Sequence, residues 1–150
     1  MTLTPLYNVL SASVIAFYVI PLILYAWTSD PFHLKALAGY IVTTLASEGI
    51  KHGVIKGRGP YGQRPAGATD CNLWCNNGPQ AGRPGMPSSH SAEAAYLAMV
   101  YGSSSHRLEW VLYALLVMGS RYAKECHSLP QIVVGAVVGV LIGLLTMRFV

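Results

Sequence analysis

The chain has 150 residues, of which 53% are hydrophobic and only 11% are charged. Its length suits a single domain, but a soluble domain of this size usually carries about a quarter charged residues. The formal net charge is +4, with ten basic residues. These stand between apolar runs rather than in a solvated basic stripe, which disfavours nucleic-acid binding. An anionic substrate or an anionic membrane surface explains the charge better.

Five apolar segments predict an all-α fold, an integral-membrane bundle of about five transmembrane helices. They run from about Leu6 to Trp27, Phe32 to Ile50, His90 to Ser103, Leu108 to Ser120 and Ile132 to Val150. The third and fourth are short for full spans, so we expect their polar ends at the interface or inside the bundle. No basic residue precedes the first run, so we interpret it as a retained helix rather than a secretory signal.

A polar loop from about Lys51 to Ser89 separates the second segment from the third. It is too long to be a simple connection, and long loops on a rigid scaffold commonly carry function. We therefore expect residues 51–89 to form the functional loop of one membrane-embedded domain, residues 1–150.

The last segment repeats a glycine at every fourth residue, at Gly135, Gly139 and Gly143. In membrane helices this spacing lets two backbones approach closely. The close approach is expected either within the bundle or between the subunits of a homo-oligomer.

The three cysteines are Cys71, Cys75 and Cys126. No second His or Cys pair accompanies the first two, so a zinc site is a weak interpretation. In an oxidising compartment Cys71 and Cys75 could form a disulfide, and free thiols are the alternative.

Three polar stretches carry the residues that phosphoryl transfer needs. They run from Lys51 to Pro60, from Gly85 to Ser91 and from Ser120 to Gln131. The charge of a transferred phosphoryl group must be held by fixed cations and backbone donors. Lys51, Arg58 and Arg121 are the candidate cations. The Pro-Ser-Ser-His sequence stands just before an apolar helix, where free backbone N–H groups can bind an anion, and the Ser88 hydroxyl is a further donor.

Two histidines then remain, His90 and His127. One could attack phosphorus while the other protonates the leaving oxygen, and this chemistry requires no metal or other cofactor. An even number of membrane crossings separates the three stretches, so all of them are expected at one face of the bilayer.

These stretches resemble the three motifs of the type-2 phosphatidic acid phosphatase superfamily: Lys-x6-Arg-Pro, Pro-Ser-Gly-His and Ser-Arg-x5-His-x3-Asp. The wording Gly-Met-Pro-Ser-Ser-His-Ser followed by Ser-Arg-x5-His-x3-Gln is most similar to the dolichyldiphosphatase branch. The likeness spans roughly Lys51 to Gly139. It implies that His127 is the nucleophile, that His90 is the general acid and later the base, and that the phosphate is held by Lys51, Arg58, Ser88, Ser89 and Arg121.

Two positions depart from the family pattern. Gln131 stands where the family has the acid that orients the nucleophile, and it cannot offset positive charge on His127. This favours a diphosphate substrate, whose leaving group departs easily. Gly59 stands where the family has proline, and a competing alignment of the first motif uses Lys56 and Arg64, which restores the Arg-Pro pair but not the spacing.

Two carboxylates fall within apolar segments, where they are costly and usually paired. Glu48 precedes Lys51 by one helical turn, which predicts an ion pair. Glu93 follows His90 by one turn and is a candidate to orient it.

The resemblance therefore predicts a metal-independent lipid phosphatase that hydrolyses a polyprenyl diphosphate through a phosphohistidine. The alternatives are a broad phosphatase acting on phosphatidate or phosphatidylglycerol phosphate, and a non-catalytic membrane protein that binds anionic lipids. The family implies a lumenal or extracytoplasmic active site of a multi-pass protein, in the endoplasmic reticulum or plasma membrane.

Overall fold

The computed structural model describes residues 4–102 and 105–149, and in them the only regular elements are helices. Two isolated β-bridges, Gln63 with Pro84 and Thr69 with Pro79, tie the long loop to itself. The helices are α1 (Thr4–Ala12), the 3₁₀ helix η1 (Ser13–Tyr18), α2 (Ile20–Thr28), α3 (Phe32–Gly49), the π-helix η2 (Ile50–Ile55), α4 (Ser89–Tyr101), α5 (Arg107–Ala123) and α6 (Leu129–Arg148). The all-α prediction is confirmed. The predicted ends at Ser103 and Val150 lie outside the described residues.

One helix of the described chain, α6, is by itself long and apolar enough to cross a membrane. The first apolar segment bends by 43° between Thr4–Tyr18 and Ile20–Thr28. Pro21 lies in the first turn of α2, where it lacks the N–H that would continue the preceding helix. Because α4 and α5 have only 13 and 17 residues, the five-span membrane bundle stays a prediction.

Helix α4 forms the centre of the bundle and packs against α3, α5 and most extensively α6. The glycines of α6 permit this contact. A Cβ added to Gly139 would lie 2.0 Å from the carbonyl oxygen of Ala92, and one added to Gly135 would lie 2.3 Å from that of Ser88. The glycine repeat therefore brings α6 against α4 of the same chain, and these glycines do not present a free surface to a second subunit.

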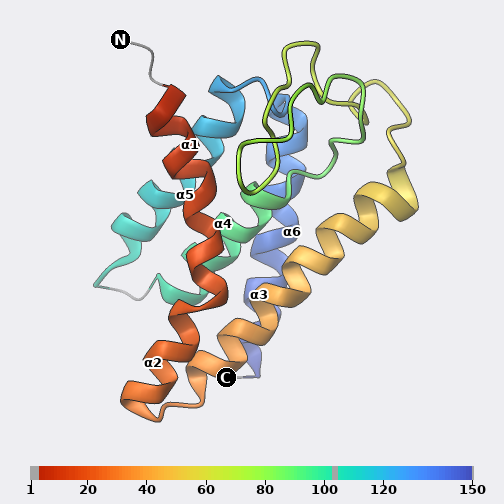
Figure 1. Cartoon of the computed structure of the whole chain (residues 1–150). Helices are drawn as coiled ribbons and strands as arrows, with labels where there is room; N and C mark the ends of the chain where they lie inside the picture. The colour runs from red at the N-terminus through yellow and green to blue at the C-terminus, as the bar shows by residue number, and fades with distance from the viewer. Residues whose placement is uncertain (1–3, 103–104, 150) are drawn as a thin grey trace.

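The three polar stretches lie at one end of the bundle (Figure 1). This end carries the C-terminus of α3, the loop that follows η2, the start of α4 and the connection between α5 and α6. The turn between α2 and α3 and the C-terminus of the chain lie at the opposite end.

Candidate active site

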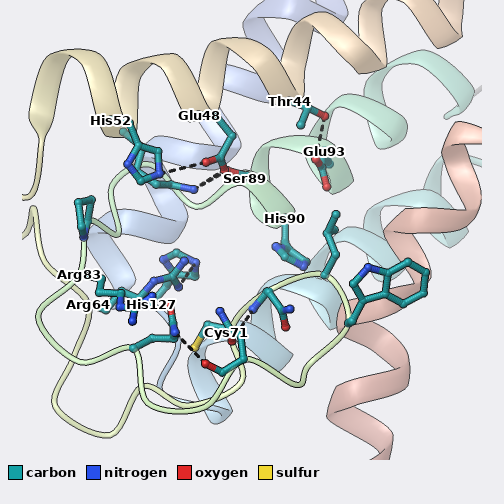
Figure 2. A pocket seen from close by; sticks show the side chains of 17 residues that line it. Thr44, Glu48, His52, Arg64, Cys71, Arg83, Ser89, His90, Glu93 and His127 are labelled. Atoms are coloured by element: carbon teal, nitrogen blue, oxygen red, sulfur yellow. Dashed lines mark hydrogen bonds and ion pairs between the residues drawn. The ribbon is translucent and has the colours of Figure 1, made fainter.

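A cavity of about 440 Å³ opens among the C-terminal part of α3, η2, the start of α4, the α5–α6 connection and the long loop. Figure 2 shows Arg64, Arg83 and His127 on one side of it and His90 and Glu93 on the other. Both histidines thus face one space, although they lie on different elements. This is the arrangement that the phosphoryl-transfer hypothesis requires.

The π-helix η2 continues α3 and carries Lys51 into the cavity, where the side chain is buried. Its Nζ lies 2.5 Å from Oε1 of Glu48 and 2.7 Å from Oγ of Ser89. The predicted ion pair between Glu48 and Lys51 is therefore confirmed. Burial lowers the pKa of Lys51, and the carboxylate of Glu48 opposes that shift.

His127 is buried and fixed at both ring nitrogens. Nδ1 lies 3.1 Å from Oε1 of Gln131, and Nε2 lies 3.1 Å from Nη1 of Arg64. Since a guanidinium only donates, Nε2 must be the accepting nitrogen, which assigns the proton to Nδ1. Burial, followed by the positive charges of Arg64 and Arg121, lowers the pKa of His127 well below its ordinary value.

Gln131 connects this histidine to the long loop. Its Nε2 donates to the carbonyl oxygens of Tyr61 and Gln63, at 2.7 and 2.6 Å. Its Oε1 accepts from His127 and from the backbone N–H of Ser128, at 3.1 Å each. The two loop carbonyls need hydrogen-bond donors, and this need fixes the orientation of the Gln131 amide. An aspartate at this position could not supply such donors.

His90 lies in the first turn of α4, and its Nε2 is buried with no hydrogen-bond partner among the described residues. Ser88 is the N-cap of α4, and its Oγ bonds the N–H and hydroxyl of Ser91, at 3.4 and 2.9 Å. Its hydroxyl therefore serves the helix start. Ser89, rather than Ser88, lines the cavity and donates to Glu48.

Besides Ser88, two further predicted phosphate ligands, Arg58 and Arg121, are not brought to the cavity lining. Arg58 is exposed on the loop. Arg121 is fully buried and donates to Oγ of Ser11 and to the carbonyl oxygen of Cys71. Arg64 lines the cavity instead, so the structure pairs Lys51 of one alignment with Arg64 of the other. The Arg-Pro pair at Arg64 was the sequence signal for this residue, and no signal pointed to Arg83, which also lines the cavity.

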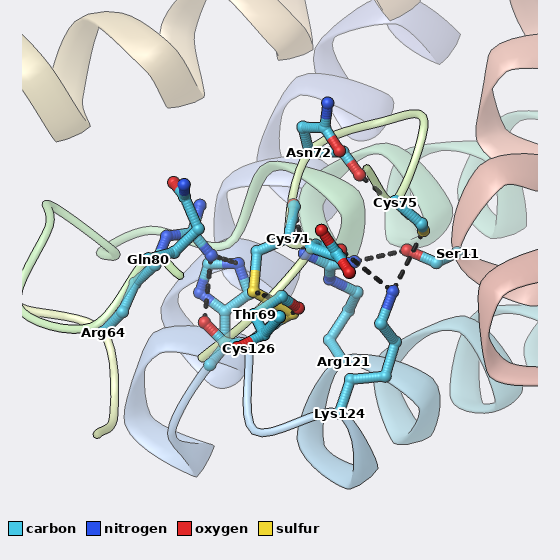
Figure 3. The surroundings of a disulfide bond; sticks show 12 residues. Ser11, Arg64, Thr69, Cys71, Asn72, Cys75, Gln80, Arg121, Lys124 and Cys126 are labelled. Atoms are coloured by element: carbon cyan, nitrogen blue, oxygen red, sulfur yellow. Dashed lines mark hydrogen bonds between the residues drawn. A yellow bond between two sulfur atoms is a disulfide. The ribbon is translucent and has the colours of Figure 1, made fainter. Parts of the chain in front are cut away.

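The structure contains a disulfide that the sequence did not point to. Cys71 bonds Cys126, with a Cα–Cα distance of 5.4 Å, and Cys75 is a free thiol (Figure 3). Of the alternatives that the sequence left open, a Cys71–Cys75 disulfide does not form and only Cys75 is a free thiol. The fold brings Cys71 against the α5–α6 connection, whereas Cys75 lies 3.0 Å from Nζ of Lys124. The disulfide fastens the loop to the residue that precedes His127.

Glu93 does not orient His90. Its Oε1 accepts from Oγ1 of Thr44 at 2.8 Å and from the hydroxyl of Tyr18 at 3.4 Å, which ties α4 to α3 and η1. Within residues 4–102 and 105–149, no group of three or more His, Cys, Asp or Glu side chains is arranged to hold a metal ion.

Buried histidines and cations thus share one cavity, at one end of a helical bundle that leaves many large apolar side chains exposed. Residues 32–150 match the PAP2 superfamily, and because this match covers most of the chain, the protein belongs to that family. Members of the family are phosphatases that generally act on lipid phosphates. Neither the curated proteins nor the solved structures gave a match.

Proposed function

We propose that the protein hydrolyses a polyprenyl diphosphate of the dolichyl type to the monophosphate and inorganic phosphate, with His127 as the nucleophile. The observation that carries the proposal is the state of His127: its proton is held at Nδ1 by Gln131, and Nε2 keeps its lone pair on the cavity side beside Arg64. An imidazole held in this tautomer can attack phosphorus once a bound phosphoryl group has drawn Arg64 away from Nε2.

In the first step, the terminal phosphoryl group is held by Lys51, Arg64, Ser89 and the first amides of α4. Nε2 of His127 forms a bond to phosphorus, and the bond between phosphorus and the bridging oxygen breaks. His90, which takes up a proton when the anionic substrate binds beside it, gives that proton to the bridging oxygen as the lipid monophosphate departs.

In the second step, a water molecule attacks the phosphohistidine. His90, now neutral, accepts a proton from this water, and the bond between phosphorus and Nε2 breaks. Inorganic phosphate leaves, and His90 is again protonated for the next cycle. All groups in both steps come from the chain itself, the substrate and water.

Gln131 supports the choice of a diphosphate. A neutral amide orients His127 but does not stabilise positive charge on the ring as it bonds to phosphorus. The reaction therefore depends more on a good leaving group, and a lipid monophosphate departs more easily than an alkoxide. A lumenal or extracytoplasmic site agrees with the Cys71–Cys126 disulfide, which needs an oxidising environment.

The test is phosphate release by purified protein in detergent, with polyprenyl diphosphate and phosphatidate as substrates. We expect preference for the diphosphate, full activity in the presence of chelator, and an acid-labile phosphoprotein that is absent in His127→Ala. His106→Ala is the matched control, because His106 is exposed and lies outside the cavity. Undiminished turnover by His127→Ala would refute the nucleophile assignment, and loss of activity with chelator would refute metal independence.

The same assay separates the alternatives. Faster release from phosphatidate or phosphatidylglycerol phosphate would make the protein a broad lipid phosphate phosphatase. Lipid binding without any phosphate release would make it a non-catalytic anionic-lipid-binding protein.

A further inference from the structure

The cavity has an apolar part formed by Leu73 and Trp74 of the long loop. Leu73 packs against the buried cluster that contains Val14, Ala94 and Val117. Ala94 follows His90 by one turn of α4, so Leu73 lies on the side of the cavity that carries His90. The cations Arg64 and Arg83 lie on the opposite side, beside His127.

The indole ring of Trp74 is exposed rather than packed against other aromatic side chains. Trp74 is 69% exposed and forms no aromatic contact among the described residues. Trp110, in contrast, lies against Phe17, Tyr101 and Tyr113. Leu73 anchors the loop in the bundle, so the neighbouring indole is held at the cavity edge without being packed.

The geometry of phosphoryl transfer determines which part of a substrate reaches this edge. Attacking and leaving groups lie roughly in line on opposite sides of phosphorus. With Nε2 of His127 attacking from one side, the leaving group lies towards His90, and therefore towards Leu73 and Trp74. The leaving group of a lipid phosphate carries the hydrocarbon chain.

We propose that Trp74, supported by Leu73, binds the first hydrocarbon units of the substrate's lipid chain. The assignment rests on the proposed phosphatase function and adds the chain-binding subsite to it. An exposed tryptophan suits this role because its ring is amphipathic and prefers the boundary between headgroups and hydrocarbon. The subsite distinguishes lipid phosphates from small water-soluble phosphates.

The first experiment compares kcat/KM for inorganic diphosphate, which has no hydrocarbon, with that for farnesyl diphosphate and a long polyprenyl diphosphate. Trp74→Ala should lower kcat/KM about tenfold for the two lipid diphosphates and leave inorganic diphosphate unchanged, and Trp74→Phe should recover most of the loss. Trp27→Ala is the matched control, since Trp27 is 84% exposed and lies in the last turn of α2, which ends at the opposite end of the bundle. Equal losses on all three substrates, or no loss on any, overturn the assignment.

A second experiment needs no turnover. A non-hydrolysable farnesyl bisphosphonate should shift the tryptophan emission of the wild-type protein and of Trp27→Phe to the blue, but not that of Trp74→Phe. If the wild-type protein fails to release phosphate yet shows this shift, the proposed reaction is wrong and the chain subsite stands. If Trp74→Phe keeps the full shift, the subsite is refuted whatever the reaction.

Discussion

Arg64 donates from Nη1 to Nε2 of His127 across 3.1 Å, although the two residues lie 63 positions apart in the chain. The same nitrogen of Arg64 also donates to the carbonyl oxygen of Cys126, at 3.0 Å. The guanidinium thus covers the nitrogen that is proposed to attack phosphorus. We expect a bound phosphoryl group to take over these donors and to free the lone pair of Nε2.

The first prediction compares two arginines of the same loop. Arg64→Gln removes the fixed charge beside the nucleophile and should lower kcat/KM about a hundredfold or more. Arg58→Gln should stay within about twofold of wild type, because Arg58 is exposed and does not line the cavity. Rates of phosphate release from one lipid substrate measure both effects. The opposite order would restore Arg58 as the phosphate ligand.

The second prediction concerns pH. The pKa of His127 is lowered by burial and then by the charge of Arg64, so the free protein carries a neutral imidazole at neutral pH. The acidic limb of kcat/KM should therefore lie below about pH 6.5, the ordinary value for histidine. In Arg64→Gln a positive neighbour is lost, the pKa of His127 rises, and the limb should move to higher pH. A limb that moves to lower pH, or stays in place, would contradict the electrostatic role of Arg64.

The third prediction concerns Gln131→Glu. The change keeps an acceptor for His127 but removes both hydrogens donated to the carbonyl oxygens of Tyr61 and Gln63. The two carbonyl oxygens would then lack donors and face a carboxylate. We expect this to lower the free energy of unfolding by about 2–4 kcal/mol, measured as a lower melting temperature in detergent. The same substitution at Gln63, whose side chain is exposed, is the control and should be nearly neutral. Equal melting temperatures would show that the loop does not depend on this amide.

The fourth prediction concerns the cysteines. Denatured, unreduced protein should react at Cys75 alone with an alkylating reagent, and all three cysteines should react after reduction. Cys126→Ser should lower stability by about 2–4 kcal/mol because the loop is no longer tied to the α5–α6 connection. Cys75→Ser should leave the melting temperature unchanged. Alkylation of Cys126 without reduction would exclude the disulfide.

The fifth prediction uses two helical glycines. In Gly139→Ala the new Cβ meets the backbone of Ala92, and separating α4 from α6 should cost about 1–3 kcal/mol. Gly119→Ala in α5 meets nothing within 4 Å and should be neutral or slightly stabilising. Thermal unfolding of the two variants in the same detergent gives the comparison. If both behave alike, the close approach at Gly139 is not needed.

Local chemistry along the chain was sufficient for much of the prediction. The apolar runs identified the helices, because the hydrophobicity that favours a helix belongs to the residues of that segment and needs no knowledge of distant contacts. The Glu48–Lys51 pair followed from helical spacing alone. The motif spacing led to His90 and His127, and both line the cavity.

The partners of the long loop were decided by tertiary structure alone. Arg64, rather than Arg58, lies at His127, and Cys71 bonds Cys126 rather than Cys75. Each of these contacts joins residues far apart in the chain, and no local periodicity encodes which turn of an irregular loop meets a distant helix end. Gln131 is a further example. Its spacing from His127 is visible in the sequence, but the sequence does not show that its amide bonds the carbonyl oxygens of Tyr61 and Gln63, which come near only when the chain folds.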